Sequence, residues 1–160
     1  MKHILNISEI EFKVSPVPMP ENIKEKYEGS KMGQVGQVLG TKKLGYNVTV
    51  VPPGKRAFPL HNHRVNEEMF FILEGEGEVR IGEETLPIKK GDFISCPPGG
   101  KEVAHQIINI SKNELRYLAV STKESPEIAD YPDSGKFGIL SENFRFLGKP
   151  DQSLGYWEGE

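Results

Sequence analysis

Apolar and polar residues alternate over short stretches throughout the chain, and Gly or Pro separates most of these stretches from one another. Short runs rich in Val, Ile, Phe, Thr and Tyr with a period of two are typical of strands that bury one face. We expect strands at Gln34–Leu39, Tyr46–Val51, Glu68–Leu73, Glu78–Ile81, Thr85–Ile88, Phe93–Cys96, Val103–Ile110 and Leu115–Ser121. The pattern therefore predicts an all-β fold.

Helical signals are weak by comparison. The segment Pro20–Ser30 begins with Pro, ends near a Gly and carries paired charges, so it predicts a short surface helix. Beyond Ser125 the pattern changes again, because Pro and Gly interrupt isolated aromatic residues up to Glu160. We expect this C-terminal segment to pack on the body of the protein or on a partner subunit rather than to be disordered.

Composition limits the classes of function. The chain has 160 residues, of which 36% are hydrophobic and 27% charged, so we expect one soluble domain with a true core. A formal net charge of -3 does not indicate binding to nucleic acid or to an anionic membrane. The only cysteine, Cys96, is expected to be a small buried apolar residue. With neither a signal peptide nor a long apolar run visible, we expect a cytoplasmic protein without membrane or nucleic-acid partners.

Three of the four histidines lie in predicted strands or directly beside them, together with a glutamate. His61 and His63 are two residues apart and point the same way from one strand, because side chains alternate along a strand. Glu68 can join them if the chain turns after His63 and Glu68 opens the next strand, facing inward with Phe70 and Ile72. His105 belongs to a third strand, so three strands can direct four side chains to one point.

Imidazoles and a carboxylate are the donors that borderline divalent metal ions prefer. Three imidazoles and one carboxylate leave a six-coordinate ion with about two open positions for water or a small ligand. Each imidazole then needs a partner for its second nitrogen, and Glu67 is a candidate although its parity points outward. The alternative is that each histidine is an ordinary hydrogen-bonded residue and that Glu68 pairs with Arg64. His3 is expected to be such an ordinary terminal residue.

The residues around the first two histidines resemble the first motif of the cupin superfamily. That motif has a Gly, then His-x-His, a Glu and a closing Gly, which correspond here to Gly54, His61, His63, Glu68 and Gly75. The spacing to the closing Gly selects Glu68, not the preceding glutamate, as the motif residue.

The second cupin motif has a Gly, Pro-x-Gly, a His and an Asn, which correspond here to Gly91, Pro97, Gly99, His105 and Asn109. Two departures are visible, since both the stretch from Gly54 to the first histidine and the stretch from Gly99 to His105 are longer than usual. Both insertions fall in loops, where they are tolerated. The second could reshape the mouth of a barrel, which makes transfer of a substrate from relatives unsafe.

The resemblance implies a double-stranded β-helix, or jelly roll, with a metal inside and frequently a homodimer. It suggests an N-terminal arm over residues 1–33, a barrel over 34–121 and a C-terminal tail over 122–160. The ligands implied are His61, His63, Glu68 and His105, holding one divalent Mn, Fe, Ni or Zn ion.

The resemblance leaves several functions open. The first is a metal-dependent enzyme acting on a small oxygen-rich molecule, a sugar or an organic acid, as an isomerase, decarboxylase or dioxygenase. The second is a protein that binds or senses such a molecule without turnover, and the third is a metal that only stabilises the fold. No residue outside the ligand set makes a convincing acid–base pair, so the catalytic residues are not assigned.

Overall fold

The structure is a computed structural model that describes residues 2–160. Its strands are β1 (Lys13–Val14), β2 (Lys31–Gly33), β3 (Leu44–Val51), β4 (Asn62–His63), β5 (Glu68–Glu74), β6 (Glu76–Ile81), β7 (Glu84–Lys89), β8 (Phe93–Cys96), β9 (His105–Ile108), β10 (Leu115–Thr122), β11 (Glu127–Tyr131), β12 (Lys136–Leu140) and β13 (Arg145–Gly148). The helices are α1 (Glu21–Tyr27) and α2 (Val35–Leu39), with 3-10 turns at Ile7–Glu9, Lys101–Val103 and Pro150–Gln152. None of the helices in the described part is long and apolar enough to cross a membrane.

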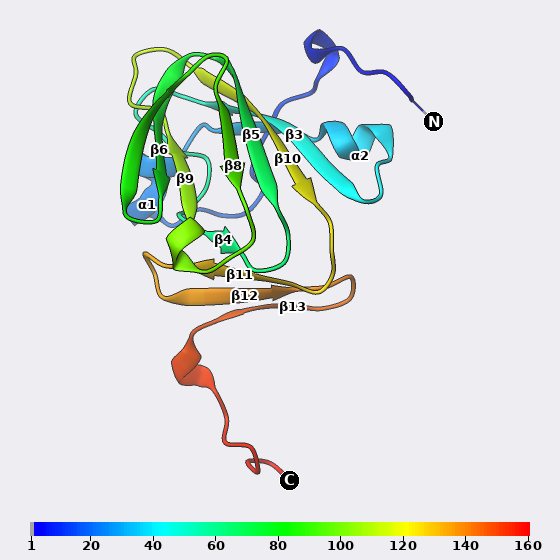
Figure 1. Ribbon diagram of the computed structural model, residues 1–160, viewed down its shortest axis with the longest axis vertical. Helices are drawn as coiled ribbons and strands as arrows, with labels where there is room; N and C mark the ends of the chain where they lie inside the picture. The colour runs from blue at the N-terminus through cyan, green and yellow to red at the C-terminus, as the bar shows by residue number, and fades with distance from the viewer. Residues whose placement is uncertain (1) are drawn as a thin grey trace.

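Two sheets of the jelly roll face each other and a third closes one end. The large sheet has the order β1-β2-β3-β10-β5-β8, and the sheet opposite it has the order β7-β6-β9. The third sheet, β13-β12-β11-β4, crosses the lower end of the barrel in Figure 1. The predicted all-β jelly roll is therefore confirmed, and the segment after β10 returns to the barrel through the pairing of β11 with β4.

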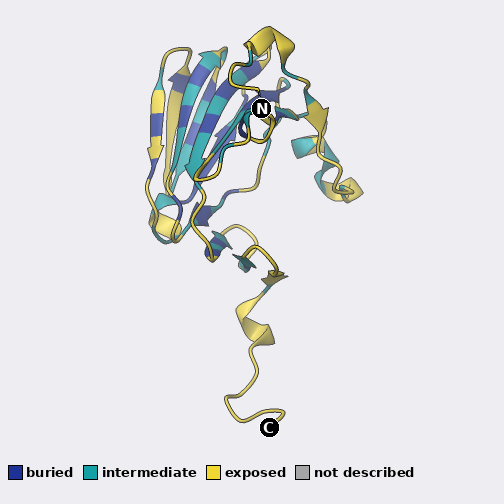
Figure 2. Cartoon of the chain, turned by 90° about the vertical axis from the view of Figure 1, so that its right-hand side faces the viewer, coloured by how far each residue is buried: buried dark blue, intermediate teal, exposed yellow. Residues whose placement is uncertain are grey.

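The core lies between the two barrel sheets. Alternate residues of β5 point into it, as predicted, so that Phe70 and Ile72 are buried, and Ile107 of β9 meets them from the opposite sheet. Tyr117 of β10 packs edge-on against Phe70 with ring centroids 5.6 Å apart. The same alternation gives the banded burial along the strands in Figure 2. The burial of these apolar side chains is the main contribution to the stability of the barrel.

The strand predicted at Gln34–Leu39 is wrong, because the chain forms helix α2 there. Val35, Val38 and Leu39 have the spacing of one helical face, which over so few residues is hard to tell from strand alternation. Gly40 ends the helix with a left-handed φ of 71°. Gly36 allows α2 to lie close to β3, since a Cβ at this position would lie 3.0 Å from the backbone nitrogen of Tyr46.

Other predicted elements are present, but their first or last residues differ from the prediction. The helix expected within Pro20–Ser30 is α1, and the strand expected at Val103–Ile110 is shorter because Lys101–Val103 form a 3-10 turn. His105 therefore opens β9. Strands β11, β12 and β13 were not predicted from the sequence, where only isolated aromatics were visible.

Candidate metal centre

Strand β4 directs two histidines into the lower end of the barrel. Asn62, between them, is fully buried on the other side, where its Nδ2 donates to Gly99 O at 2.7 Å and to Asp130 Oδ2 at 2.9 Å. Because neighbouring side chains of a strand point to opposite faces, this anchor turns His61 and His63 inward. The pairing of Asn62 with Asp130 fixes the register of β4 against β11.

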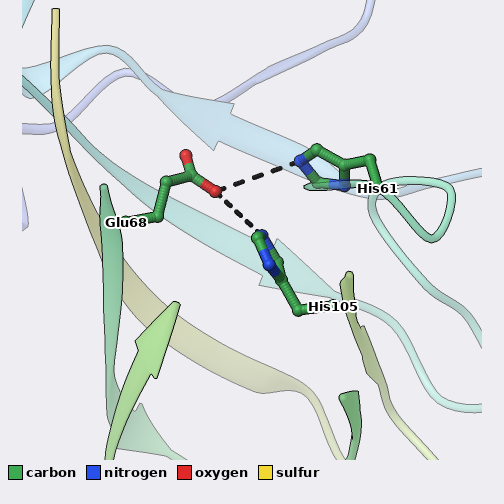
Figure 3. Close-up of side chains that lie close together, drawn as sticks. All are labelled: His61, Glu68 and His105. Carbon is green, nitrogen blue, oxygen red and sulfur yellow. Dashed lines mark hydrogen bonds and ion pairs between the residues drawn. The ribbon is translucent and has the colours of Figure 1, made fainter. Parts of the chain in front are cut away.

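The carboxylate of Glu68 lies where the three histidines meet. Glu68 opens β5 after the turn that the strand parity required, and His105 opens β9, which joins His61 through two backbone hydrogen bonds of 3.2 and 2.8 Å. Glu68 Oε2 lies 3.0 Å from His105 Nε2, 3.6 Å from His63 Nε2 and 3.9 Å from His61 Nε2. Figure 3 shows the side chains of His61 and His105 directed at this carboxylate.

His61, Glu68 and His105 form a group that could hold a metal ion. One ligand atom from each lies within 4.8 Å of the other two, and all three side chains are mostly buried. Two imidazoles and a carboxylate suit a divalent transition metal better than Mg²⁺ or Ca²⁺, which prefer oxygen alone. His63 lies at the edge of this group, near Glu68 but outside the tightest cluster.

The Nδ1 atoms of the three imidazoles also face oxygen atoms. His61 Nδ1 lies 2.9 Å from Pro59 O, and His105 Nδ1 lies 3.3 Å from Val103 O. His63 Nδ1 instead faces Glu127 Oε2 at 3.5 Å.

Glu67 is exposed, and within the described residues it makes no contact with the histidines. The sequence prediction therefore missed Glu127. No signal in the sequence indicated it, because the strand that carries Glu127 was not predicted.

Residues 47–121 match the model of the Cupin domain family. The match includes all four predicted ligands, and the barrel around them is the one described above. Residues 47–121 thus form a domain of the cupin superfamily. The jelly roll around the His/Glu group is the fold of a small cupin protein.

Two curated relatives match over about half of their own length. An uncharacterized protein of Methanocaldococcus jannaschii is 39% identical over 72 residues, 45% of this chain and 54% of the relative. An oxalate-binding protein of Thermotoga maritima is 36% identical over 70 residues, 44% of this chain and 54% of the relative. The chain thus spans about half the length of the curated relatives it matches.

Among solved structures, a sugar phosphate isomerase of the cupin superfamily from Silicibacter pomeroyi has the same fold over almost the whole chain. The TM-score is 0.82, with 23% identity, covering 96% of this chain and 97% of the other. At that identity the likeness concerns the fold, and it extends beyond the barrel to the segments on either side.

Electrostatics in this cupin favour the protonation states that a metal requires. Burial, aided by the charge of His105, lowers the pKa of His61 to about 4, so its imidazole is neutral at pH 7. Burial alone would raise the pKa of Glu68, but its hydrogen bond to His105 and the nearby charges of His63 and His61 bring that pKa below its usual value. A neutral His61 beside an ionised Glu68 can bind a metal without these two groups losing a proton.

The surroundings of the group are partly apolar and partly open. Phe70 lies below His105, with ring centroids 5.4 Å apart, and Tyr131 stacks on His61 at 6.1 Å. Cys96 is buried beside Glu68, and burial together with that carboxylate raises the pKa of its thiol to about 12. As predicted, Cys96 is a small core residue; a thiol with so high a pKa is a poor nucleophile.

A pocket of about 450 Å³ opens beside His63 and Glu68. Hydroxyl groups of Ser121 and Thr122 and the ammonium group of Lys123 lie along it. A larger cavity of about 650 Å³ lies beneath the N-terminal arm, but none of the four predicted ligands lines it. Of these two cavities, only the smaller one is therefore lined by members of the ligand group, His63 and Glu68.

Proposed function

We propose that this cupin is a metal-dependent enzyme that acts on a small oxygen-rich molecule, a sugar derivative or an organic acid. His61, His63, Glu68 and His105 would hold one divalent Mn, Fe, Ni or Zn ion. The observation that carries the proposal is that the Nε2 atoms of all three histidines lie within 3.0–3.9 Å of one oxygen of Glu68. No structural role requires three imidazoles to gather around a single carboxylate.

The donor set supports a reactive ion rather than a purely structural one. Structural zinc sites are closed tetrahedra that usually include cysteine ligands, whereas the donors gathered here are three histidines and one glutamate. A six-coordinate ion would have about two positions left for a ligand. When bound, such an ion would polarise a carbonyl or hydroxyl oxygen of that ligand.

The pocket beside Glu68 supports a polar ligand. The hydroxyl group of Ser121 can donate to an oxygen and Lys123 can pair with an anionic group, whereas the Thr122 hydroxyl already donates to Asn66 Oδ1. Its volume of about 450 Å³ suits a small molecule. Sugar derivatives and organic acids fit this combination, and we expect the ligand to reach the metal through this pocket.

The alternative proposal is a protein that binds such a molecule through the same metal without converting it. The relative from Thermotoga maritima that bears the name oxalate-binding protein favours this alternative. The single cysteine, kept buried and reduced, suits the cytoplasm in either case.

Metal analysis tests the shared part of both proposals. Protein purified without chelators should contain one equivalent of metal per chain, or take up one on reconstitution. His105→Ala and Glu68→Gln should each weaken metal binding by more than the roughly 10–100-fold that loss of an outer contact costs. His3→Ala is the matched control, because His3 is the one histidine outside the group, and it should bind metal as the parent does. A parent protein that binds no metal after reconstitution would refute the proposal.

Turnover separates the enzyme from the binding protein. The metal-loaded cupin should be mixed with oxalate or with a sugar phosphate and followed by NMR. Conversion that Glu68→Gln abolishes supports an enzyme, whereas a saturable shift of the ligand signals without conversion supports the binding protein. Neither conversion nor binding of any sugar or acid would count against both.

A further inference from the structure

The Nδ1 atoms of the three imidazoles face two different kinds of oxygen atom. Backbone carbonyls face Nδ1 of His61 and of His105, at 2.9 and 3.3 Å. A proton on Nδ1 is stabilised by such an oxygen, which leaves the lone pair of Nε2 free to bind a metal. No carbonyl takes this role for His63, whose buried Nδ1 makes no hydrogen bond of good geometry within the described residues.

Glu127 supplies the missing oxygen. Its Oε2 lies 3.5 Å from His63 Nδ1, while the side chain is 7% exposed. The carboxylate is held firmly, because Oε1 accepts hydrogen bonds from the backbone nitrogens of Arg64, Val65 and Ile128 at 2.8–3.2 Å. Oε2 accepts from the backbone nitrogen of Asn66 at 2.8 Å and from its side-chain amide. The whole turn between β4 and β5 is thus built around this one carboxylate.

Because an imidazole must be neutral to bind a metal, His63 then carries one proton, and two carboxylates compete for it. Glu68 Oε2 lies 3.6 Å from Nε2, and Glu127 Oε2 lies 3.5 Å from Nδ1. A proton on Nε2 would pair with Glu68 and block the atom that has to bind the metal. A proton on Nδ1 would pair with Glu127 and leave Nε2 free.

We propose that Glu127 is a positioning residue that keeps the proton of His63 on Nδ1 and so makes Nε2 a metal ligand. The inference rests on the proposed metal site and adds to it the role of a residue outside that site. Glu127 belongs to β11, beyond the residues 47–121 that match the Cupin domain. The site is therefore incomplete without the segment that follows the barrel.

Glu127→Gln is the informative substitution, because the side chain keeps its size. The glutamine loses the two hydrogen bonds that Oε2 accepts from Asn66, which weakens the turn. Its amide oxygen can still accept from the three backbone nitrogens that now bond to Oε1, which places its NH₂ group next to His63. That group donates, so Nδ1 must accept and the proton moves to Nε2. We expect metal affinity to fall by roughly 10–100-fold, the usual cost of losing such a contact.

The tautomer of His63 can be read directly by ¹⁵N NMR of the metal-free protein. We expect the Nδ1–H form in the parent and the Nε2–H form in Glu127→Gln. An Nε2–H form in the metal-free parent would overturn the inference, and this result does not depend on whether the variant folds. The tautomer also tests Glu127 if the parent binds no metal, so failure of the inference and failure of the metal site give different results.

A double-mutant cycle separates positioning from a general effect on the fold. In a His63→Ala background, Glu127→Gln should change metal affinity less than about 3-fold, because the residue through which it acts is gone. An equal loss in both backgrounds would mean that Glu127 only stabilises the turn. A parent that binds metal and a Glu127→Gln variant that binds it equally well would refute the inference and leave the metal site standing.

Discussion

Gly75 and Gly91 are two of the turn glycines that the cupin motifs single out, and they differ in what surrounds them. Both have left-handed φ angles, of 85° and 96°, which glycine adopts without strain. A Cβ at Gly75 would lie 2.5 Å from Glu114 O, whereas a Cβ at Gly91 would have no atom within 4 Å. The first glycine is needed for both conformation and space, the second for conformation alone.

Gly91→Ala should therefore lower the free energy of unfolding by about 1–2 kcal/mol, the usual cost of a left-handed residue with a Cβ. Gly75→Ala should lower it by more, because the backbone of β10 has to move as well. Urea denaturation of both variants measures the difference. Equal losses would mean that the contact with Glu114 is relieved at no cost.

At this same scale, strand parity was enough to bring most of the candidate site together. Glu68 and His105 each open a strand, and His61 forms a β-bridge with His105. At such positions the direction of a side chain follows from the alternation of faces along a strand. Glu127 could not be found in this way. Its partners lie about sixty residues earlier in the chain, and an isolated glutamate in a sequence is more often a solvated residue.

Strand β11 and the turn after it are tied across the lower end of the barrel by two further carboxylates of unequal importance. Asp130 accepts hydrogen bonds from Arg64 Nε at 2.8 Å and from the buried Asn62 at 2.9 Å. Asp133 pairs with Arg80 at 2.9 Å on a surface where its own side chain is half exposed. The first contact keeps a buried donor satisfied, and the second is an ordinary surface ion pair.

Asp130→Ala should destabilise this region by about 1–3 kcal/mol, because it leaves the amide of Asn62 without its carboxylate. Hydrogen exchange should accelerate in β4, β11 and β12 and remain slow in β3, β5 and β10. Asp133→Ala is the matched control and should cost less than about 1 kcal/mol. Uniform acceleration over the whole barrel in Asp130→Ala would show that β11 does not open by itself.

The elements differ in how well the sequence could predict them. Strands β5 to β8 follow one another through Gly-containing turns, so local alternation and turn chemistry were sufficient. The helix at Val35–Leu39 is too short for its period to be distinguished from alternation. Strands β11 to β13 depend on pairing with one another and with β4, which is sixty or more residues away, and such pairing leaves little local pattern.

The C-terminal end of the chain leads away from the barrel and exposes large apolar side chains. Leu154, Tyr156 and Trp157 are 70%, 86% and 78% exposed, and Figure 2 shows this end extending beyond the body of the molecule. Exposed aromatic residues gathered in this way are typical of contact surfaces. The homodimer that the cupin resemblance implies stays a prediction, and this segment is where we expect part of its contact.

Trp157 makes that prediction measurable, because it is the only tryptophan of the chain. If a second copy covers the segment, its emission should be blue-shifted and protected from acrylamide at high protein concentration. Dilution should then shift the emission to the red as light scattering reports monomers. Leu154→Asp with Tyr156→Ser should give the monomeric spectrum at every concentration, whereas Leu86→Asp, on the exposed strand β7, should not. A dimer by scattering whose Trp157 stays fully quenchable would place the contact elsewhere, and a monomer at all concentrations would refute the homodimer itself.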